Sequence, residues 1–553
     1  MGIAVLSMAA AGMADGSRES HPTLILHGGI VHTAADAQPV AGAVAIRGDR
    51  IVRVGSSAEV LPLGGPGTEV VDLGGAAVVP GFHDAHGHVA GLGALRLSLD
   101  LADTADAEEI LRLVRERAAG TAPGGWIIGR GWDQNDWPGQ GWPDRHMLDR
   151  AAPGHLVYLT RVDGHAAWVN SRALALAGVS RDTPDPPGGR VMRDTAGEPT
   201  GILVDAAQQM VRRHVPPPDA AALEARVRAA DEEFQRLGLT MVHDAGADLA
   251  LTEIYERLAR ETRLATRLYV MLANAPATTG PWFRRGPLID PAHRLTIRAV
   301  KLVADGALGS RGAALLEDYA DEPGNRGLAV TPADRLEADA GAAVKAGFQP
   351  CTHAIGDRAN RETLDAYERL MREAPGTRAL RPRVEHAQIL DAADLPRFGA
   401  LGIIASMQPI HCTSDMPWAA RRLGAGRVSE GAYAWRTLLD SGAVIAAGSD
   451  FPVEPPNPLL GFHAAITRQA HDGGPPGGWN PDQRMARGEA LRAMTRDAAF
   501  AAHAEQDLGT IAPGKLADLV VLSADIMTMP PAQILRTRVL RTIVAGRTTY
   551  RAD

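Results

Sequence analysis

The chain has 553 residues, which is too long for one simple core, and its 45% hydrophobic and 22% charged residues are typical of a folded globular protein. The net charge of -8, without a basic stripe, argues against nucleic acid as a partner. The two cysteines, Cys351 and Cys412, do not suggest a disulfide framework or a thiolate zinc site.

The N-terminal sequence, residues 1–20, contains an apolar stretch that ends in small residues. It lacks the basic region of a secretory signal, so we expect a cytoplasmic protein, with export as the alternative. No later segment has the uncharged length of a transmembrane helix, and we expect no membrane partner.

Both ends of the chain are rich in short Val/Ile runs punctuated by Gly and Asp. Such runs occur in residues 22–78 and again in 507–550. Because two distant β segments flank one large middle, we predict that they combine into a small composite β-sandwich domain.

The middle, residues 79–506, alternates short apolar strands with helical stretches, which indicates βα units around a parallel sheet. Eight strands are predicted, the number that closes a (β/α)8 barrel, an α/β fold. They are expected at 76–82, 239–246, 266–272, 297–306, 347–357, 383–388, 402–409 and 443–450.

The first two of these strands are separated by residues 90–235, far more than a normal crossover, which predicts an inserted subdomain. It holds five of the nine tryptophans, among them Trp132 and Trp137. One interpretation is a lid whose indole rings contact a substrate. The alternative is a small local core, since Trp is commonly buried.

Polar residues follow several strands at the point where a barrel places its active site. His86 and His88 are two residues apart, so in extended backbone both face the same side. Four further candidates lie at the ends of later strands: Lys301, His353, His386 and Asp450. Nitrogen and oxygen ligands without thiolate favour zinc, with manganese or iron as alternatives.

Lys301 is unusual because the chain has only two other lysines, Lys345 and Lys515, among 57 basic residues. It lies in an apolar run, and Lys can lose its proton whereas Arg cannot. The alternative is a lysine that extends along apolar surface into water.

These motifs resemble the amidohydrolase superfamily: "PGFHDAHGH", "VKLVADGALGSRGA", "CTHAIGD", "VEHAQ", "GSDFPVEPPNP" and "GTIAPGKLADLVVL". The long insertion, "RVDGHAAWVNSRAL" and "EPTGILVDAA" resemble the family-3, YtcJ-like branch, which includes N-substituted formamide deformylase. The resemblance extends from about residue 22 onward.

The resemblance implies a binuclear metal centre. His86 and His88 would bind the first ion and His353 and His386 the second, with a carbamate, formed by carbon dioxide on Lys301, bridging them. Asp450 would contact the first ion and the attacking water. The implied reaction is hydrolysis of a C–N bond in a small-molecule amide or formamide.

Weaker candidates lie nearby. His165, favoured by the resemblance, and Asp163 could hold the substrate carbonyl from the insertion. Arg311 could bind an anion, although a structural salt bridge is the alternative. His411 and Cys412 could line the pocket.

Two other functions stay open. A mononuclear deaminase typically lacks the strand-four lysine and carries a Glu shortly after a metal-binding His, whereas "THAIGDRAN" offers only Asp357 after His353. A binding protein without catalysis is the other alternative, because fold does not guarantee function. A homodimer is the expected assembly.

Overall fold

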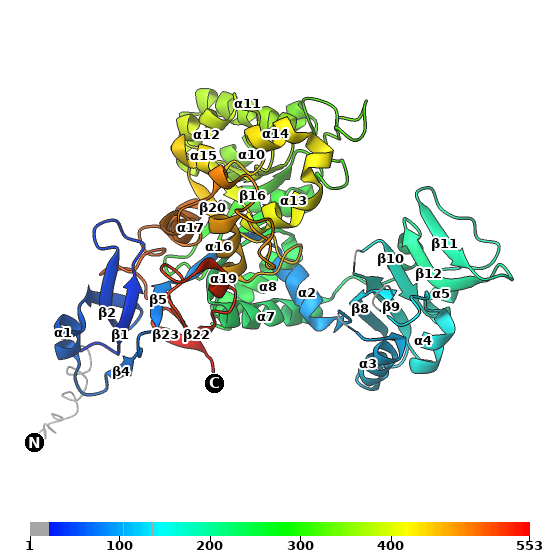
Figure 1. Cartoon of the computed structure of the whole chain (residues 1–553), viewed down its shortest axis with the longest axis horizontal. Helices are drawn as coiled ribbons and strands as arrows, with labels where there is room; N and C mark the ends of the chain where they lie inside the picture. Colours follow the sequence, from blue (N-terminus) through cyan, green and yellow to red (C-terminus); the bar gives the residue numbers. More distant parts are fainter. Residues whose placement is uncertain (1–20, 103, 135–136, 163) are drawn as a thin grey trace, which may run out of the picture. The chain divides into compact units, whose positions relative to one another are not determined.

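The computed structural model describes residues 21–102, 104–134, 137–162 and 164–553, so the N-terminal stretch on which export depends lies outside the described residues. The chain divides into two compact units (Figure 1). The first takes residues up to His88 and from Asp231 onward, and the second takes Val89–Ala230. Among the described residues, no helix has both the length and the apolar character to cross a membrane.

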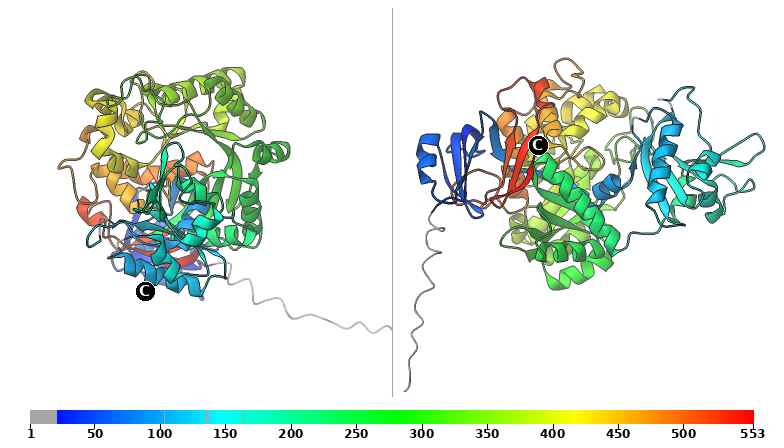
Figure 2. Two further views of the ribbon diagram at one scale, coloured as in Figure 1. Left: turned by 90° about the vertical axis from the view of Figure 1, so that its right-hand side faces the viewer. Right: turned by 90° about the horizontal axis from the view of Figure 1, so that it is seen from below.

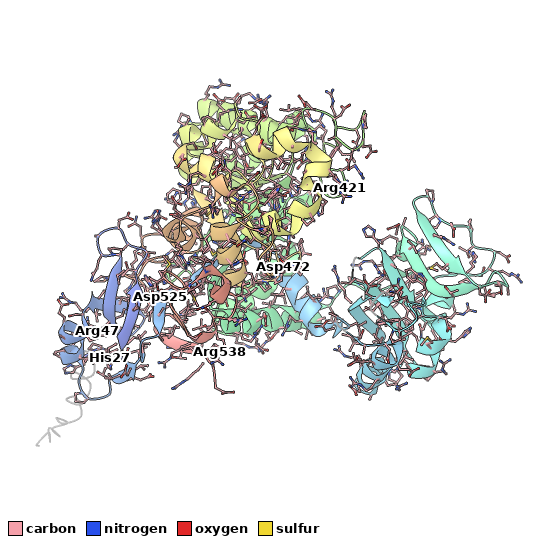
Figure 3. All side chains as sticks on the ribbon, in the orientation of Figure 1. His27, Arg47, Arg421, Asp472, Asp525 and Arg538 are labelled. Atoms are coloured by element: carbon pink, nitrogen blue, oxygen red, sulfur yellow. The ribbon has the colours of Figure 1, made fainter. Side chains whose placement is uncertain are left out.

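Both ends of the chain build one eight-stranded sheet in the first unit (Figure 1). The ends meet because Val79 of the early segment pairs antiparallel with Val520 of the late one. Asp525, labelled in Figure 3, adds an ion pair to His32 at 2.7 Å. The division of this domain into two sandwich layers stays a prediction. Its strands are β1 (Leu24–His32), β2 (Val40–Arg47), β3 (Arg50–Gly55), β4 (Glu69–Asp72), β5 (Ala77–Pro80), β21 (Leu519–Leu522), β22 (Val539–Val544) and β23 (Arg547–Arg551).

The middle of the chain forms the expected run of parallel strands, in the order of the sequence. A short strand, β15 (Leu288–Ile289), pairs antiparallel with the fourth of them. The eight strands are β6 (Phe82–Gly87), β13 (Leu239–Ala247), β14 (Arg267–Ala273), β16 (Leu295–Val303), β17 (Gln349–Ala354), β18 (Arg383–His386), β19 (Ile404–Met407) and β20 (Ile445–Ala447).

Helices surround these strands, as the left view of Figure 2 shows. Each lies between consecutive strands or after the last one, as βα units require. The main ones are α7 (Ala220–Leu237), α8 (Leu249–Arg260), α9 (Pro276–Arg285), α10 (Ala333–Lys345), α11 (Asp357–Glu373), α12 (Leu395–Leu401), α13 (Pro409–Leu423), α14 (Ala425–Gly431), α15 (Trp435–Asp440), α16 (Pro458–Thr467), α17 (Arg487–Ala493) and α18 (Arg496–Ala501).

The strand predicted at 76–82 is in fact divided between two sheets. Its apolar part, β5, belongs to the terminal sheet, and the first barrel strand, β6, begins only at Phe82. Gly81 separates them; a Cβ there would lie 2.1 Å from Oγ1 of Thr240, so only glycine fits. The prediction was wrong here because β6 has a polar sequence, "FHDAHG", which does not read as a buried strand although every residue in it is buried.

Hydrogen bonds beyond the end of β20 bring the last strand back to the first. The amide of Asp450 donates to the carbonyl of His86 at 2.7 Å, and the amide of His88 donates to the carbonyl of Phe451 at 2.8 Å. Gly87 and Phe451 form a parallel bridge. This closure makes the carboxyl ends of β6 and β20 neighbours.

Apolar side chains fill the opposite end of the barrel. The cluster includes Met241, Tyr269, Ala299 and Cys351, which face inward from four strands, together with Leu516 near the C-terminal segment. Cys351 is fully buried, as a small packed residue should be.

The second unit contains a six-stranded sheet covered by helices. Its strands run in the order β11 (Gly189–Arg193), β12 (Pro199–Asp205), β10 (Ala166–Val169), β9 (Leu156–Arg161), β8 (Trp126–Trp132) and β7 (Leu99–Asp100). The helices are α2 (Val89–Leu97), α3 (Ala107–Ala119), α4 (Arg145–Ala151), α5 (Ser171–Leu176) and α6 (Gln208–Arg212).

Candidate metal centre

The carboxyl ends of the barrel strands bring all six predicted residues to one site within the first unit. His86 Nε2 lies 3.0 Å from Lys301 Nζ and 3.7 Å from Asp450 Oδ1. The Oδ1 atom of Asp450 is also 3.1 Å from His88 Nε2. The strand-one pair, the strand-four lysine and the strand-eight carboxylate are thus in direct contact.

The other two histidines stand on the next strands. The ring of His386 lies 4.8 Å from that of His86 and 4.6 Å from that of His353, between centroids. His353 Nε2 lies 3.5 Å from Asp305 Oδ1. The imidazoles therefore form a continuous cluster across the barrel mouth.

Two groups of ligand atoms are close enough to share an ion, since their atoms lie within 4.8 Å of one another. The first is His86, His88 and Asp450; the second is His386, His411 and Asp450. His411, in α13, lies with its Nε2 3.8 Å from Asp450 Oδ2. From the sequence we expected His411 only to line the pocket, and the structure places it as a candidate ligand.

Burial keeps the imidazoles of His86, His353 and His386 neutral, which is the form that binds metals. Burial, and then the charge of Lys301, lowers the pKa of His86 to about 4 and that of His353 to about 3. Burial, and then His353, holds the pKa of His386 well below its usual value. Burial also lowers the pKa of Lys301.

Asp450 stays ionised. Burial alone would raise its pKa, but the hydrogen bond from His88 and the neighbouring His86 and His411 hold the pKa below its ordinary value. Among the described residues, the Nε2 atoms of His353 and His411 are buried and have no hydrogen-bond partner. An unpaired buried nitrogen is costly, so these atoms fit a site that receives a cation.

Two side chains that form hydrogen bonds with His86 and His386 were missed in the sequence. Glu385 Oε2 is 2.5 Å from His86 Nδ1, and Gln408 Oε1 is 2.8 Å from His386 Nδ1. Strand alternation predicts that the neighbours Glu385 and His386 face opposite sides. Both contact His86 because the backbone turns to a φ of 76° at His386. The signal that could have found Glu385 is a carboxylate directly beside a predicted ligand, in a strand predicted to lie inside the barrel.

The tryptophans of the insertion form a core. Trp132 is fully buried, and its Nε1 donates to the carbonyl of Leu159 at 2.9 Å. Trp137 is 6% exposed, and its ring centroid lies 6.0 Å from that of Trp132. The ring centroid of Trp168 lies 6.2 Å from that of Trp132. The structure thus favours the local core over rings that contact a substrate.

The weaker candidates from the sequence lie in different surroundings. His165 Nδ1 is 2.7 Å from Asp205 Oδ1 in the second unit, and its side chain is exposed. Asp163 lies outside the described residues. Arg311 forms ion pairs with Asp321 at 3.0 Å and Glu322 at 3.2 Å, which fits the structural salt bridge rather than an anion site.

Comparison with known proteins places most of the chain in one group. The sequence profile described as "Amidohydrolase family" matches residues 69–550. YtcJ of Bacillus subtilis (strain 168) is 34% identical over 536 residues, covering 95% of this chain and 99% of YtcJ. The N-substituted formamide deformylase of Arthrobacter pascens is 28% identical over 523 residues, covering 92% of this chain and 95% of that enzyme.

Comparison with solved structures supports the same grouping. An uncharacterised metal-dependent hydrolase from Pyrococcus furiosus superposes with a TM-score of 0.76 at 28% identity, over 91% of this chain and 100% of that one. The eight parallel strands, the metal-compatible cluster at their carboxyl ends and the profile match lead to the same conclusion. The chain belongs to the amidohydrolase family.

Proposed function

We propose that the protein is a metal-dependent hydrolase that cleaves the C–N bond of a small amide, with N-substituted formamides as the first substrate class. The observation that carries the proposal is Asp450, whose two oxygens face two separate groups of imidazoles. The similarity to the A. pascens deformylase supports the choice of bond, and the P. furiosus hydrolase supports the dependence on metal.

His86, His88 and Asp450 would hold one ion, and His386 with His353 or His411 would hold the other. Lys301, next to His86, would bridge the ions after reaction with carbon dioxide to a carbamate, and its lowered pKa favours the neutral amine that this reaction needs. These ligand types fit zinc. Bound divalent ions lower the pKa of a water molecule and polarise a carbonyl oxygen.

The proton transfers fall to Asp450. As an ionised carboxylate at the cluster, it can accept a proton from the attacking water and pass it to the leaving amine. His165 stays a prediction as the group that holds the substrate carbonyl. A cytoplasmic location and a homodimer also stay predictions.

Deamination by a mononuclear centre is the second candidate, and two observations oppose it. Lys301 lies against the imidazoles, where such deaminases typically have no lysine. Asp357, the acidic residue that follows His353, accepts the amide of Leu316 at 2.8 Å and begins α11, which is a structural role. A binding protein without catalysis would have no need for the complete set of ligands.

The test is the number of metal ions per chain, measured by elemental mass spectrometry on protein expressed with zinc and bicarbonate. The loaded protein is then assayed on N-alkyl formamides, matched acetamides and amino-substituted heterocycles. Two ions and release of formate support the proposal. One ion with release of ammonia from a heterocycle favours deamination, and no metal after reconstitution favours the binding protein.

A further inference from the structure

Glu385 is a fully buried carboxylate directly behind one of the candidate metal ligands. Its side chain and that of His86 have no exposed surface, and their Oε2 and Nδ1 atoms are 2.5 Å apart. The other nitrogen of His86, Nε2, lies on the far side of the ring, 3.0 Å from Lys301 Nζ. The two nitrogens of this imidazole therefore have separate partners.

The partner on Nδ1 determines where the proton of His86 lies. An ionised carboxylate only accepts hydrogen bonds, so Nδ1 carries the hydrogen. Nε2 then has a free lone pair, and it points to the side where Lys301 and Asp450 lie. A lone pair there is what a cation needs.

Arg383 holds Glu385 in place with two contacts. Arg383 Nε lies 2.7 Å from Glu385 Oε1, and Nη2 donates to Oε2 at 3.0 Å. Burial of an unpaired carboxylate would cost free energy. The bidentate ion pair with Arg383 compensates the charge and fixes the plane of the carboxylate.

Arg383 is itself held from three other strands. Its Nη2 donates to the carbonyl of Ala85 at 2.7 Å and to Ser406 Oγ at 2.8 Å. Its Nη1 lies 3.0 Å from His243 Nδ1. Because β6, β13 and β19 each supply a contact, the guanidinium has little conformational freedom. The Glu385 carboxylate that it holds is therefore also fixed in position.

In the second group of candidate ligands (His386, His411 and Asp450), His386 has no such charged partner among the described residues. His386 Nδ1 contacts the neutral amide oxygen of Gln408 at 2.8 Å. A charged acceptor strengthens a hydrogen bond about twofold over a neutral one. The two groups of imidazoles therefore differ in how firmly their ligands are oriented.

We propose that Arg383 and Glu385 are positioning residues that lock His86 in the tautomer with the hydrogen on Nδ1, so that Nε2 binds the metal. This inference rests on the metal centre of the proposed function. It assigns a role to Arg383 and Glu385 of β18, which were not among the residues expected from the sequence to take part in the site.

The test uses the full-length protein, stripped with a chelator and titrated with zinc against a chromophoric chelator. Glu385→Asp keeps the charge opposite Arg383 but withdraws the carboxylate from His86 by one methylene. The pair Arg383→Gln with Glu385→Gln removes both charges together. The matched control is Arg267→Gln with Asp518→Asn, another buried two-pronged pair, with contacts of 2.7 and 2.9 Å, away from the site.

Both site variants are expected to bind zinc about 10- to 100-fold more weakly than the wild type, and the control is expected to bind it equally well. If the double variant does not fold, Glu385→Asp carries the test. Unchanged zinc affinity in Glu385→Asp, or an equal loss in the control, would overturn the inference. A wild-type protein that takes up no zinc would overturn the proposed function itself, and the inference with it.

Cobalt substitution gives a second readout. The visible bands of bound Co2+ report the geometry of its ligands, so a reoriented His86 should change their position in Glu385→Asp and leave them unchanged in the control. Identical spectra together with identical zinc affinity would show that the pair has a structural role alone.

Discussion

The amide of Asp450 donates a hydrogen bond to the carbonyl of His86 at 2.7 Å, and this contact joins the last strand of the barrel to the first. It places the Asp450 carboxylate 3.7 Å from the imidazole of His86, although the two residues are 364 positions apart in the sequence. The contact that closes the barrel thus also places two of the candidate metal ligands side by side.

Replacing the strand-four lysine tests its role in the centre. Lys301→Arg keeps a cation but cannot form a carbamate, because Arg does not lose its proton. We expect fewer ions per chain and a loss of turnover of at least about 100-fold, as removal of a metal ligand implies. Metal content and turnover should be measured beside Lys345→Arg, at the exposed end of α10, which should behave as the wild type. Wild-type turnover in Lys301→Arg would refute the bridging role.

Asp450→Asn tests the proton transfer. The amide cannot accept a proton, so kcat should fall by roughly 10²- to 10⁴-fold. Asp525→Asn, in the terminal segment beside His32, serves as the control and should keep kcat. A kcat within twofold of the wild type would leave Asp450 without a catalytic role.

Zinc should stabilise the folded protein. The buried Nε2 atoms of His353 and His411 gain a partner when an ion binds, and binding to the folded state alone adds about 2.7 kcal/mol at a zinc concentration 100 times Kd. Calorimetry of stripped and reloaded protein should therefore show a higher Tm after reloading. In His86→Asn the rise should shrink, and a Tm that zinc leaves unchanged in the wild type would contradict the site.

The tryptophan core makes a prediction about stability. Trp132→Ala removes a fully buried ring and should lower the free energy of unfolding of the second unit by about 3–5 kcal/mol. Trp142, which is 43% exposed, should tolerate the same change far better. Denaturant titration with limited proteolysis measures both. A raised KM in Trp132→Ala without any loss of stability would instead support the lid.

His503 should make stability depend on pH. Burial, and then Arg298 and Arg381, lower its pKa from 6.5 to about 3 in the folded state. Between these values the unfolded chain binds more protons, so stability falls as pH falls through this window, by at most about 1.4 kcal/mol per pH unit. His503→Asn, which suits the φ of 57° there, should show a shallower loss from pH 6.5 downward.

Urea midpoints across the window measure the difference between His503→Asn and the wild type. The exposed His146 provides the control, since His146→Asn should leave the slope unchanged. Parallel slopes for His503→Asn and wild type would show that His503 does not carry the effect.

Much of the fold and the site could be predicted from sequence because the signals are local. Apolar runs such as 297–306 and 347–357 mark strands, and a polar residue at the end of such a run marks the barrel mouth. Lys301 was recognisable because it interrupts an apolar strand, and His86 and His88 because their spacing puts both on one side.

The sequence by itself therefore determined the parallel barrel, the inserted unit and the six residues of the cluster. Only the tertiary structure decided that β6 starts at Phe82, that Trp132 is buried, and that Glu385 and His411 contact the cluster. The physical reason is that these features depend on which distant segments meet. A polar strand inside a closed barrel looks like a loop in sequence, and a side chain next to a turn at positive φ leaves the alternation that sequence patterns assume.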